Sequence, residues 1–213
     1  MRMKEDHMKN GQLKAAYNVQ IAVENYFIVQ AYVSNDRTDY NTLIPVLEKH
    51  KNAFGEILGE VTADSGYCSE KNLLYLKKHK ISSYIKLHVH DIRKSRAYTE
   101  EIGKYYNMKT QIFEDELYYI CHDGRELHHI RTEKKEQAGY TQTFEVYGCS
   151  DCSGCRHKEK CLYKYDAEKD AEKNKVMKIN EQWEALKEES HGNIQSEKGI
   201  LIRQIRSIQT EGQ

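Results

Sequence analysis

The first well-patterned stretch of the chain alternates apolar and polar residues. The apolar positions are Tyr17, Val19, Ile21 and Val23, and a second apolar run covers residues 26–33. A period of two is typical of a half-buried strand, and the polar pair Glu24-Asn25 between the two runs favours a turn. The pattern therefore predicts a β-hairpin over residues 17–33.

Two helices and two short strands are predicted after the hairpin. The first helix begins near a capping sequence at 39–42 and runs to about residue 54, with Pro45 in its first turn. The second begins at Ser69-Glu70 and directs leucines inward and lysines outward. Apolar segments at 60–64 and 83–87 are typical of strands. The order β-β-α-β-α-β predicts an α/β core with a mixed sheet.

The composition changes between residues 88 and 165, where long apolar runs are few. Short strands are predicted at 116–121, 127–131 and 144–147, the first two joined by a turn at Asp123-Gly124. We interpret this block as a small cysteine-rich β insert that interrupts the core. Apolar residues then recur at helical spacing over 200–208. The predicted domains are a polar segment at 1–14, the first part of the core at 15–87, the insert at 88–165 and a C-terminal helical part at 166–213.

Charge and hydropathy narrow the class of protein. Lys plus Arg and Asp plus Glu both number 33, so the formal net charge of +0 does not itself indicate nucleic-acid binding. No apolar run reaches the length of a membrane span, and the charged N-terminus lacks the apolar region of a signal peptide. We therefore expect a cytoplasmic protein that does not enter a membrane.

A DNA-binding surface in such a chain has to come from local clusters of basic residues. One such cluster consists of Lys86, Arg93, Lys94 and Arg96. Phosphate contacts from these side chains would give salt-dependent, sequence-independent DNA affinity. The alternative interpretation is an ordinary solvated loop.

Two carboxylates far apart in the sequence are candidates for metal chemistry. Asp64 ends the strand predicted at 60–64, and a carboxylate at a strand end projects toward the crevice where α/β proteins bind ligands. Glu211 lies three residues beyond Ile208 and borders the apolar face of the last helix. Such carboxylates can hold Mg2+ for phosphoryl transfer. The alternatives are a turn residue for Asp64 and a solvated side chain for Glu211, and turn or helix-cap roles are favoured for Asp36 and Asp39.

Four cysteines fall within thirteen residues and form a second candidate site. Cys149, Cys152, Cys155 and Cys161 have the spacing C-x2-C-x2-C-x5-C. In a reducing compartment this pattern favours a structural Zn2+ site, and Cys121 could replace one of the four. Cysteines without a metal and an iron–sulfur cluster are the alternatives, although the last gap is longer than in ferredoxins and no proline follows. Cys68 is interpreted as a small, partly buried side chain.

Motifs along nearly the whole chain resemble a known family. They are Asn10-Gly11-Gln12-Leu13-Lys14, Tyr17-Asn18-Val19-Gln20-Ile21-Ala22-Val23, Thr62-Ala63-Asp64-Ser65-Gly66-Tyr67, the four clustered cysteines and Arg206-Ser207-Ile208-Gln209-Thr210-Glu211-Gly212. In this order they resemble the DDE transposases of bacterial insertion sequences. The closest resemblance is to the branch with a cysteine-rich insert before the last catalytic helix.

The resemblance implies a ribonuclease H-like fold and a site for Mg2+. It implies DNA cleavage and strand transfer at transposon ends through a D-D-E triad, with Asp64 as the second aspartate and Glu211 as the glutamate. The strand that bears the family's first aspartate would lie upstream of Met1. On the last helix Ser207 stands where related transposases often carry an arginine, and Arg206 precedes it.

The resemblance therefore predicts a piece of a transposase catalytic domain, trimmed at both ends and inactive on its own. Whether the chain itself is an enzyme is left open. Its expected partners are transposon-end and target DNA, and another copy or a full-length transposase. The alternatives are a non-catalytic, zinc-stapled protein that binds DNA or a transposase, and an unrelated zinc-containing structural domain.

Overall fold

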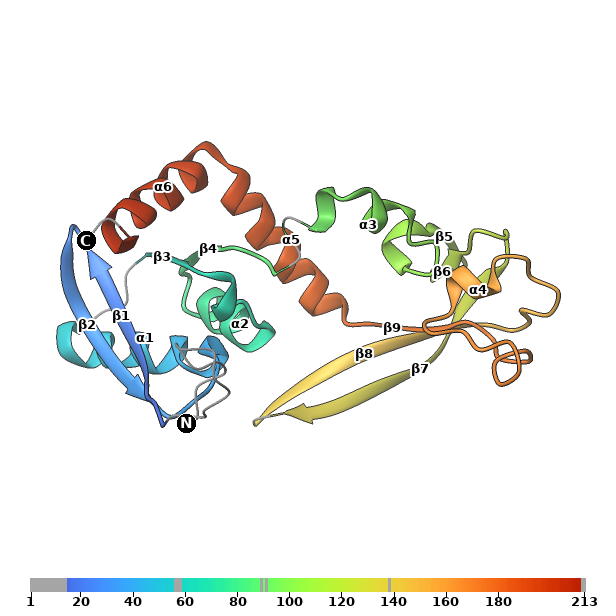
Figure 1. The fold of residues 1–213 in the computed structure, drawn as a ribbon, viewed down its shortest axis with the longest axis horizontal. Helices are drawn as coiled ribbons and strands as arrows, with labels where there is room; N and C mark the ends of the chain where they lie inside the picture. The colour runs from blue at the N-terminus through green and yellow to red at the C-terminus, as the bar shows by residue number, and fades with distance from the viewer. Residues whose placement is uncertain (1–14, 56–58, 89, 91, 138, 212–213) are drawn as a thin grey trace. The chain divides into compact units, whose positions relative to one another are not determined.

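The structure is a computed structural model that describes residues 15–55, 59–88, 90, 92–137 and 139–211, without the side chains of Gln137, Thr210 and Glu211. The motif at 10–14 lies outside the described residues. The chain divides into two compact units (Figure 1). The first unit comprises Met1–His90 and Leu186–Gln213, and the second comprises Asp91–Ala185. The domain prediction instead placed its boundaries at residues 88 and 165.

The first unit follows the predicted order of elements. These are β1 (Asn18–Glu24), β2 (Phe27–Ser34), α1 (Leu43–Phe54), β3 (Glu60–Ala63), α2 (Glu70–Lys78) and β4 (Ser82–Ile85), with short 3-10 turns at Asp39–Asn41 and Ser65–Tyr67. The predicted hairpin is confirmed, because β1 and β2 pair antiparallel. Its turn residues Asn25 and Tyr26 have φ of 50° and 68°, the left-handed conformation that suits a two-residue hairpin turn.

The single mixed sheet predicted for this unit is wrong for the described residues. β1 and β2 form one two-stranded sheet, and β3 and β4 form another. β3 and β4 are parallel, and α2 makes the crossover that a parallel pair requires. The sequence pattern gave the strands but not their partners, because pairing between distant strands is decided by tertiary packing rather than by local periodicity.

The core of the first unit lies between its helices and the β3–β4 pair. Its most deeply buried side chains are Leu73, Leu76, Ile85, Leu87 and Ile194. α5 (Glu181–Gln195) contributes its later part to this unit, and the buried Ser190 Oγ donates a hydrogen bond of 2.9 Å to the Ile85 carbonyl of β4. This bond fixes the helix against the strand.

The second unit is built on a five-stranded antiparallel sheet. The strands in order are β5 (Lys109–Phe113), β6 (Glu116–Ile120), β7 (Glu126–Gln137), β8 (Tyr140–Cys149) and β9 (Val176–Ile179). Its helices are α3 (Arg96–Glu100) and α4 (Lys158–Cys161), and 3-10 turns lie at Ile92–Lys94 and Tyr105–Asn107. The three predicted strands are confirmed, but β7 and β8 are longer than expected, and β5 and β9 were not predicted.

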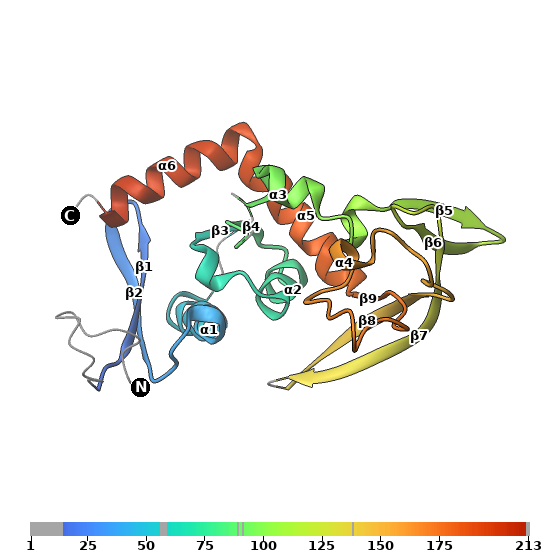
Figure 2. The ribbon, with the colours of Figure 1, turned by 45° about the vertical axis from the view of Figure 1, so that its right-hand side comes forward.

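The β7–β8 pair extends well beyond its neighbours in the sheet (Figure 2). β6 pairs with β7 only at Glu126 and Leu127, and β9 pairs with β8 only over 145–148. A bulge lies in β7 between His129 and Arg131, and beyond Thr132 the β8 residues that face β7 no longer pair with β9. Among the described strands, the outer part of the ribbon is therefore two-stranded.

No helix in the described ranges has both the length and the apolar character needed to cross a membrane.

Candidate functional site

Asp64 stands at the point where β3 ends, as the sequence predicts. The residue has extended backbone dihedrals, with φ of −68° and ψ of 164°, and precedes the 3-10 turn Ser65–Tyr67. Its side chain is 63% exposed, and its Oδ2 atom accepts a hydrogen bond of 2.7 Å from Arg206 Nη2. The strand end therefore presents a carboxylate to solvent and to one guanidinium group.

Arg206 belongs to α6 (Glu197–Glu211), so the ion pair ties the last helix to the end of β3. Near its other end the same helix forms an ion pair between Lys198 Nζ and Glu60 Oε2, at the start of β3. The ammonium group of Lys198 also lies 5.9 Å from the ring centroid of Tyr84 on β4. These contacts place α6 along the β3–β4 pair.

Glu211 ends α6, and its side chain lies outside the described residues. It follows Arg206 by five residues, which corresponds to about 7.5 Å along a helix axis. The convergence of Asp64 and Glu211 on one metal stays a prediction. What the structure adds is that the helix bearing Glu211 contacts Asp64 through Arg206.

Asp39 is a second carboxylate beside the Asp64 turn, and sequence reasoning missed its role. Its Oδ1 atom accepts hydrogen bonds from Asn18 Nδ2 at 2.8 Å and from Gln20 Nε2 at 2.9 Å. Asp39 begins the 3-10 turn Asp39–Asn41, so the turn role favoured for it is confirmed, whereas the residue that caps α1 is Thr42 and the helix-cap role is wrong. Asn18 and Gln20 are two residues apart and share one face of β1, a pairing of amide donors that could have suggested a common acceptor.

Gly66 lets the turn that follows Asp64 approach the Asp39 carboxylate. A Cβ atom at residue 66 would lie 2.9 Å from Asp39 Oδ2, closer than real Cβ contacts allow. The residue therefore has a packing role in addition to its place in the turn. A side chain at this position would require the Asp39 carboxylate to shift from its place.

Tyr67 links the two carboxylates electrostatically. Burial raises the pKa of its phenol to about 12, the negative charges of Asp39 and Asp64 act in the same direction, and Arg206 opposes them. We call Asp39, Asp64, Tyr67 and Arg206 the Asp64 cluster. The cluster offers two carboxylates, a hydroxyl that keeps its proton at neutral pH, and one permanent cation.

The donor atoms of the Asp64 cluster suit a hard cation, because Mg2+ prefers carboxylate oxygens and water. Asp39 Oδ1 is fixed by two amides, and Asp64 is exposed enough to accept a ligand. Within the described residues, no group of three or more His, Cys, Asp or Glu side chains is arranged to hold a metal ion.

The predicted DNA-binding residues fall in both units. Lys86 follows β4 in the first unit, whereas Arg93 and Lys94 end a 3-10 turn and Arg96 begins α3 in the second. Arg96 Nε forms an ion pair of 2.6 Å with Glu100 one helical turn away. Their role in DNA binding stays a prediction.

The clustered cysteines surround one hollow in the second unit. The hollow is partly open to solvent, and its cysteines are Cys121, Cys149, Cys152, Cys155 and Cys161. All of them are free thiols. Cys149 and Cys152 also belong to the buried core of this unit. The structure thus adds Cys121 to the four cysteines grouped by sequence spacing.

Residues 120–213 match a family model described as the transposase DDE domain, a stretch somewhat shorter than half of the chain. The matched stretch contains the five cysteines around the hollow and α6 with Arg206, whereas Asp64 lies before it. No curated protein and no solved structure matches the chain. The match supports a relationship to DDE transposases.

Proposed function

We propose that the chain is part of the catalytic domain of a DDE transposase of a bacterial insertion sequence, with a ribonuclease H-like core. The observation that carries this proposal is the match of residues 120–213 to the transposase DDE domain. Its partners would be transposon-end and target DNA, together with another transposase copy. The thiols of the second unit would bind a structural metal, for which the sequence favours Zn2+.

The geometry of the first unit supports the proposal. α6, the helix that ends at Glu211, contacts β3 and β4, and Arg206 reaches the carboxylate at the end of β3. A strand-end aspartate next to the helix that bears a distant glutamate is the arrangement that a two-carboxylate metal site needs.

In the proposed reaction Asp64 and Glu211 would hold Mg2+ through carboxylate oxygens. When bound, the ion would stabilise the charges that develop on the attacking and leaving oxygens at a DNA phosphate. Asp39 adds a negative charge held in place by Asn18 and Gln20. Tyr67 stays protonated at neutral pH and can donate a hydrogen bond, but it cannot act as a base there.

A specific observation favours low activity in this chain. The guanidinium of Arg206 forms an ion pair with Asp64 Oδ2 at 2.7 Å, so a metal ion at this carboxylate would compete with an existing cation. The second candidate function is therefore a non-catalytic protein that binds DNA or a transposase. We propose that this chain alone nicks DNA slowly or not at all.

Metal binding at Asp64 tests the proposed function independently of turnover. Mn2+ serves as the probe for Mg2+, and its affinity is measured by paramagnetic resonance on the full chain. Asp64→Asn and Glu211→Gln should each weaken binding by about tenfold or more, since each removes a ligand. Asp36→Asn is the matched control, because the Asp36 carboxylate bonds to Ser34 outside the Asp64 cluster. Metal affinity that is indifferent to both Asp64 and Glu211 would contradict the site.

A nicking assay on transposon-end DNA with Mg2+ separates the two candidate functions. We expect salt-dependent DNA binding with little or no cleavage. Cleavage that disappears in Asp64→Asn but persists in Asp36→Asn would disprove the proposed inactivity and support an enzyme. DNA binding without metal affinity at Asp64 would favour the non-catalytic function.

A further inference from the structure

The hollow of the second unit brings together thiols from three separate segments. Cys121 follows β6, Cys149 ends β8, and Cys152, Cys155 and Cys161 lie on the loop and short helix beyond β8. A tetrahedral metal centre needs four thiolates, and the hollow offers five thiols. Hydrogen bonds at the sulfur atoms of Cys149 and Cys152 and the backbone contacts of the other cysteines distinguish the four from the fifth.

Cys121 is held at the hollow by the turn between β6 and β7. Its N–H donates to the Arg125 carbonyl at 2.8 Å, and its carbonyl accepts from the Gly124 N–H at 2.9 Å. Gly124 has a φ of +79°, which favours glycine. The position of Cys121 is therefore fixed by a closed backbone turn.

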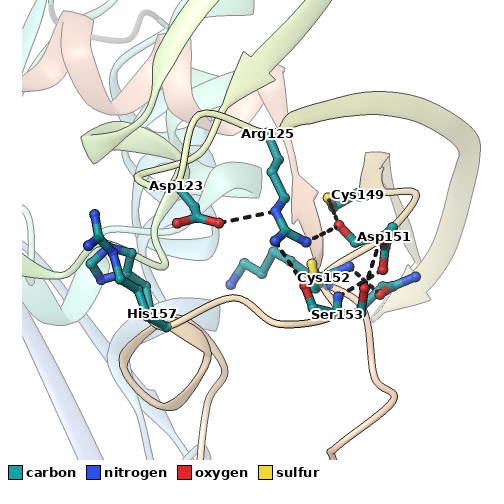
Figure 3. A network of polar contacts seen from close by, with 10 residues as sticks. Asp123, Arg125, Cys149, Asp151, Cys152, Ser153 and His157 are labelled. Carbon is teal, nitrogen blue, oxygen red and sulfur yellow. Dashed lines mark hydrogen bonds and ion pairs between the residues drawn. The ribbon is translucent and has the colours of Figure 1, made fainter.

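Arg125 fastens this turn to the loop that carries Cys152 (Figure 3). Its Nε atom pairs with Asp123 at 3.1 Å, while Nη1 and Nη2 donate to the carbonyls of Asp151 and Ser153 at 2.8 and 2.9 Å. One planar guanidinium thus joins two segments that lie more than twenty residues apart. These contacts of the Arg125 guanidinium hold Cys121 and Cys152 at the same hollow.

The two neighbouring cysteines Cys149 and Cys152 have opposite hydrogen-bonding roles. Cys149 Sγ donates to the Asp151 carbonyl at 3.2 Å, as only a protonated thiol can. Cys152 Sγ accepts from the Lys175 N–H at 3.3 Å, the kind of bond that stabilises a metal-bound thiolate. Cys152 therefore has the surroundings of a ligand, and Cys149 has those of a structural thiol.

Backbone hydrogen bonds hold Cys155 and Cys161 at the hollow. The Cys155 N–H donates to the Cys152 carbonyl at 3.4 Å, and the Cys161 N–H donates to the His157 carbonyl at 2.9 Å. Both cysteines line the hollow together with Cys121 and Cys152.

Cations line the same hollow and suit a negatively charged centre. They are Arg125, Lys158 and Lys175. Lys175 Nζ donates to the Cys161 carbonyl at 3.0 Å, and Lys158 Nζ donates to the Ala171 carbonyl, so both ammonium groups are held in place. Four thiolates around Zn2+ or around an oxidised four-iron cluster leave a net charge of about −2, which these cations offset.

We propose that Cys121, Cys152, Cys155 and Cys161 are the four thiolate ligands of a soft-metal centre, and that Cys149 is not a ligand. Binding draws the four sulfur atoms from the walls of the hollow toward the metal and releases their protons to solvent. This set replaces Cys149 of the sequence-based hypothesis with Cys121. A Zn2+ ion and an iron–sulfur cluster share the same four-thiolate chemistry. The proposal rests on the structural metal included in the proposed function and names its ligands, and its tests do not involve transposase activity.

Metal content of the full chain, purified without oxygen, tests the site. Zinc, iron and sulfide are measured together with the visible absorption spectrum. Zinc without visible absorption identifies a zinc site, and iron with sulfide and absorption identifies a cluster. The absence of bound metal after growth with either metal would overturn the proposal.

Single Cys→Ser variants test the ligand set. C121S and C155S should lower the affinity for the identified metal by at least about tenfold, whereas C149S should retain it. C68S is the second control, because Cys68 lies in the first unit. Metal retained in C121S but lost in C149S would overturn the assignment.

A measurement on the wild-type chain covers the case in which a variant fails to fold. Alkylation of the native protein is mapped by mass spectrometry with and without a chelator. Metal should protect Cys121, Cys152, Cys155 and Cys161, and the chelator should expose them together. Protection by metal of Cys149 in place of Cys121 would contradict the proposal.

Discussion

The two units of the chain differ in how completely they cover their apolar side chains. The second unit buries an aromatic and aliphatic cluster on one continuous sheet, in which Leu127 is fully buried and Tyr119 packs edge-on against Tyr147. The first unit buries a core around Leu76 but leaves much of its hairpin and last helix exposed. Its exposed apolar residues include Val19, Ile21, Phe27, Ile28, Val33, Leu201 and Ile208.

The buried cores and the candidate sites are distributed differently in the two units. The first unit holds the Asp64 cluster, and its hairpin and last helix leave apolar side chains exposed although its core around Leu76 is buried. The second unit has a core on its sheet and a thiol-lined hollow beside that core. We therefore expect the two units to respond separately to substitution.

The largest expected effect on stability comes from truncating one buried leucine in the core of each unit. Leu76→Ala and Leu127→Ala remove fully buried leucines from the first and second units. Each should reduce the free energy of unfolding of its own unit by ~2–5 kcal/mol. Hydrogen exchange followed by mass spectrometry, with peptides assigned to each unit, measures both effects. Equal loss of protection in both units would show that they unfold as one.

Ser190→Ala should have a smaller effect, confined to the first unit. The substitution removes the buried hydrogen bond from Ser190 to the Ile85 carbonyl, which leaves that acceptor with one partner fewer. We expect a loss of about 1–3 kcal/mol in the free energy of unfolding. Ser82→Ala, at an exposed position on β4, is the matched control. A denaturant titration that treats the two variants alike would refute the role of the bond.

The response to alkaline pH should separate the units through their tyrosines. The pKa values of Tyr67 and Tyr147 are both raised from 10.0 to about 12, in each case mainly by burial. A raised folded-state pKa contributes stability that is present below pH 10 and is lost as pH rises toward 12. Tyr67→Phe should flatten this loss in the first unit and Tyr147→Phe in the second. Unchanged alkaline titration curves would contradict the burial of these phenols.

The smallest expected effect on stability concerns Arg96. Its ion pair with Glu100 is largely exposed, so Arg96→Gln should change the free energy of unfolding by less than about 0.5 kcal/mol. If Arg96 contacts a DNA phosphate, the same variant should lower the salt slope of binding by about one. Fluorescence anisotropy over a salt series measures the slope. A slope equal to that of wild type would remove Arg96 from the DNA-binding surface.

The predictable part of the fold is the part with local signals. The hairpin, α1, α2 and the strand before Asp64 followed from periodicity and turn residues over short windows. β7 exceeded its prediction because its outer half is mostly charged and lacks alternation, and β9 is only four residues long. The division into separate sheets depends on contacts between distant segments, which a single sequence does not display.

The residues of the candidate sites were also predictable only where the sequence signal was local. Asp64 could be found from a strand that stops before Ser65-Gly66, which is a local pattern. The ion pair of Arg206 with Asp64 and the hydrogen bond from Arg125 to the Asp151 carbonyl join residues that are distant in sequence. Sequence spacing therefore suggested Cys149, whereas the folded contacts favour Cys121.

The outer part of the β7–β8 ribbon bears on the solubility of the protein. Both margins of a two-stranded ribbon carry backbone groups that could recruit strands from other molecules. Within the described residues, this part of β7 carries Glu133, Lys134, Lys135 and Glu136 in succession. Charges of both signs disfavour stacking of identical ribbons in register, because each charge would face its own copy. These charges thus oppose pairing of the outer ribbon with ribbons of other molecules. Replacing them with β-branched residues would make such pairing more favourable.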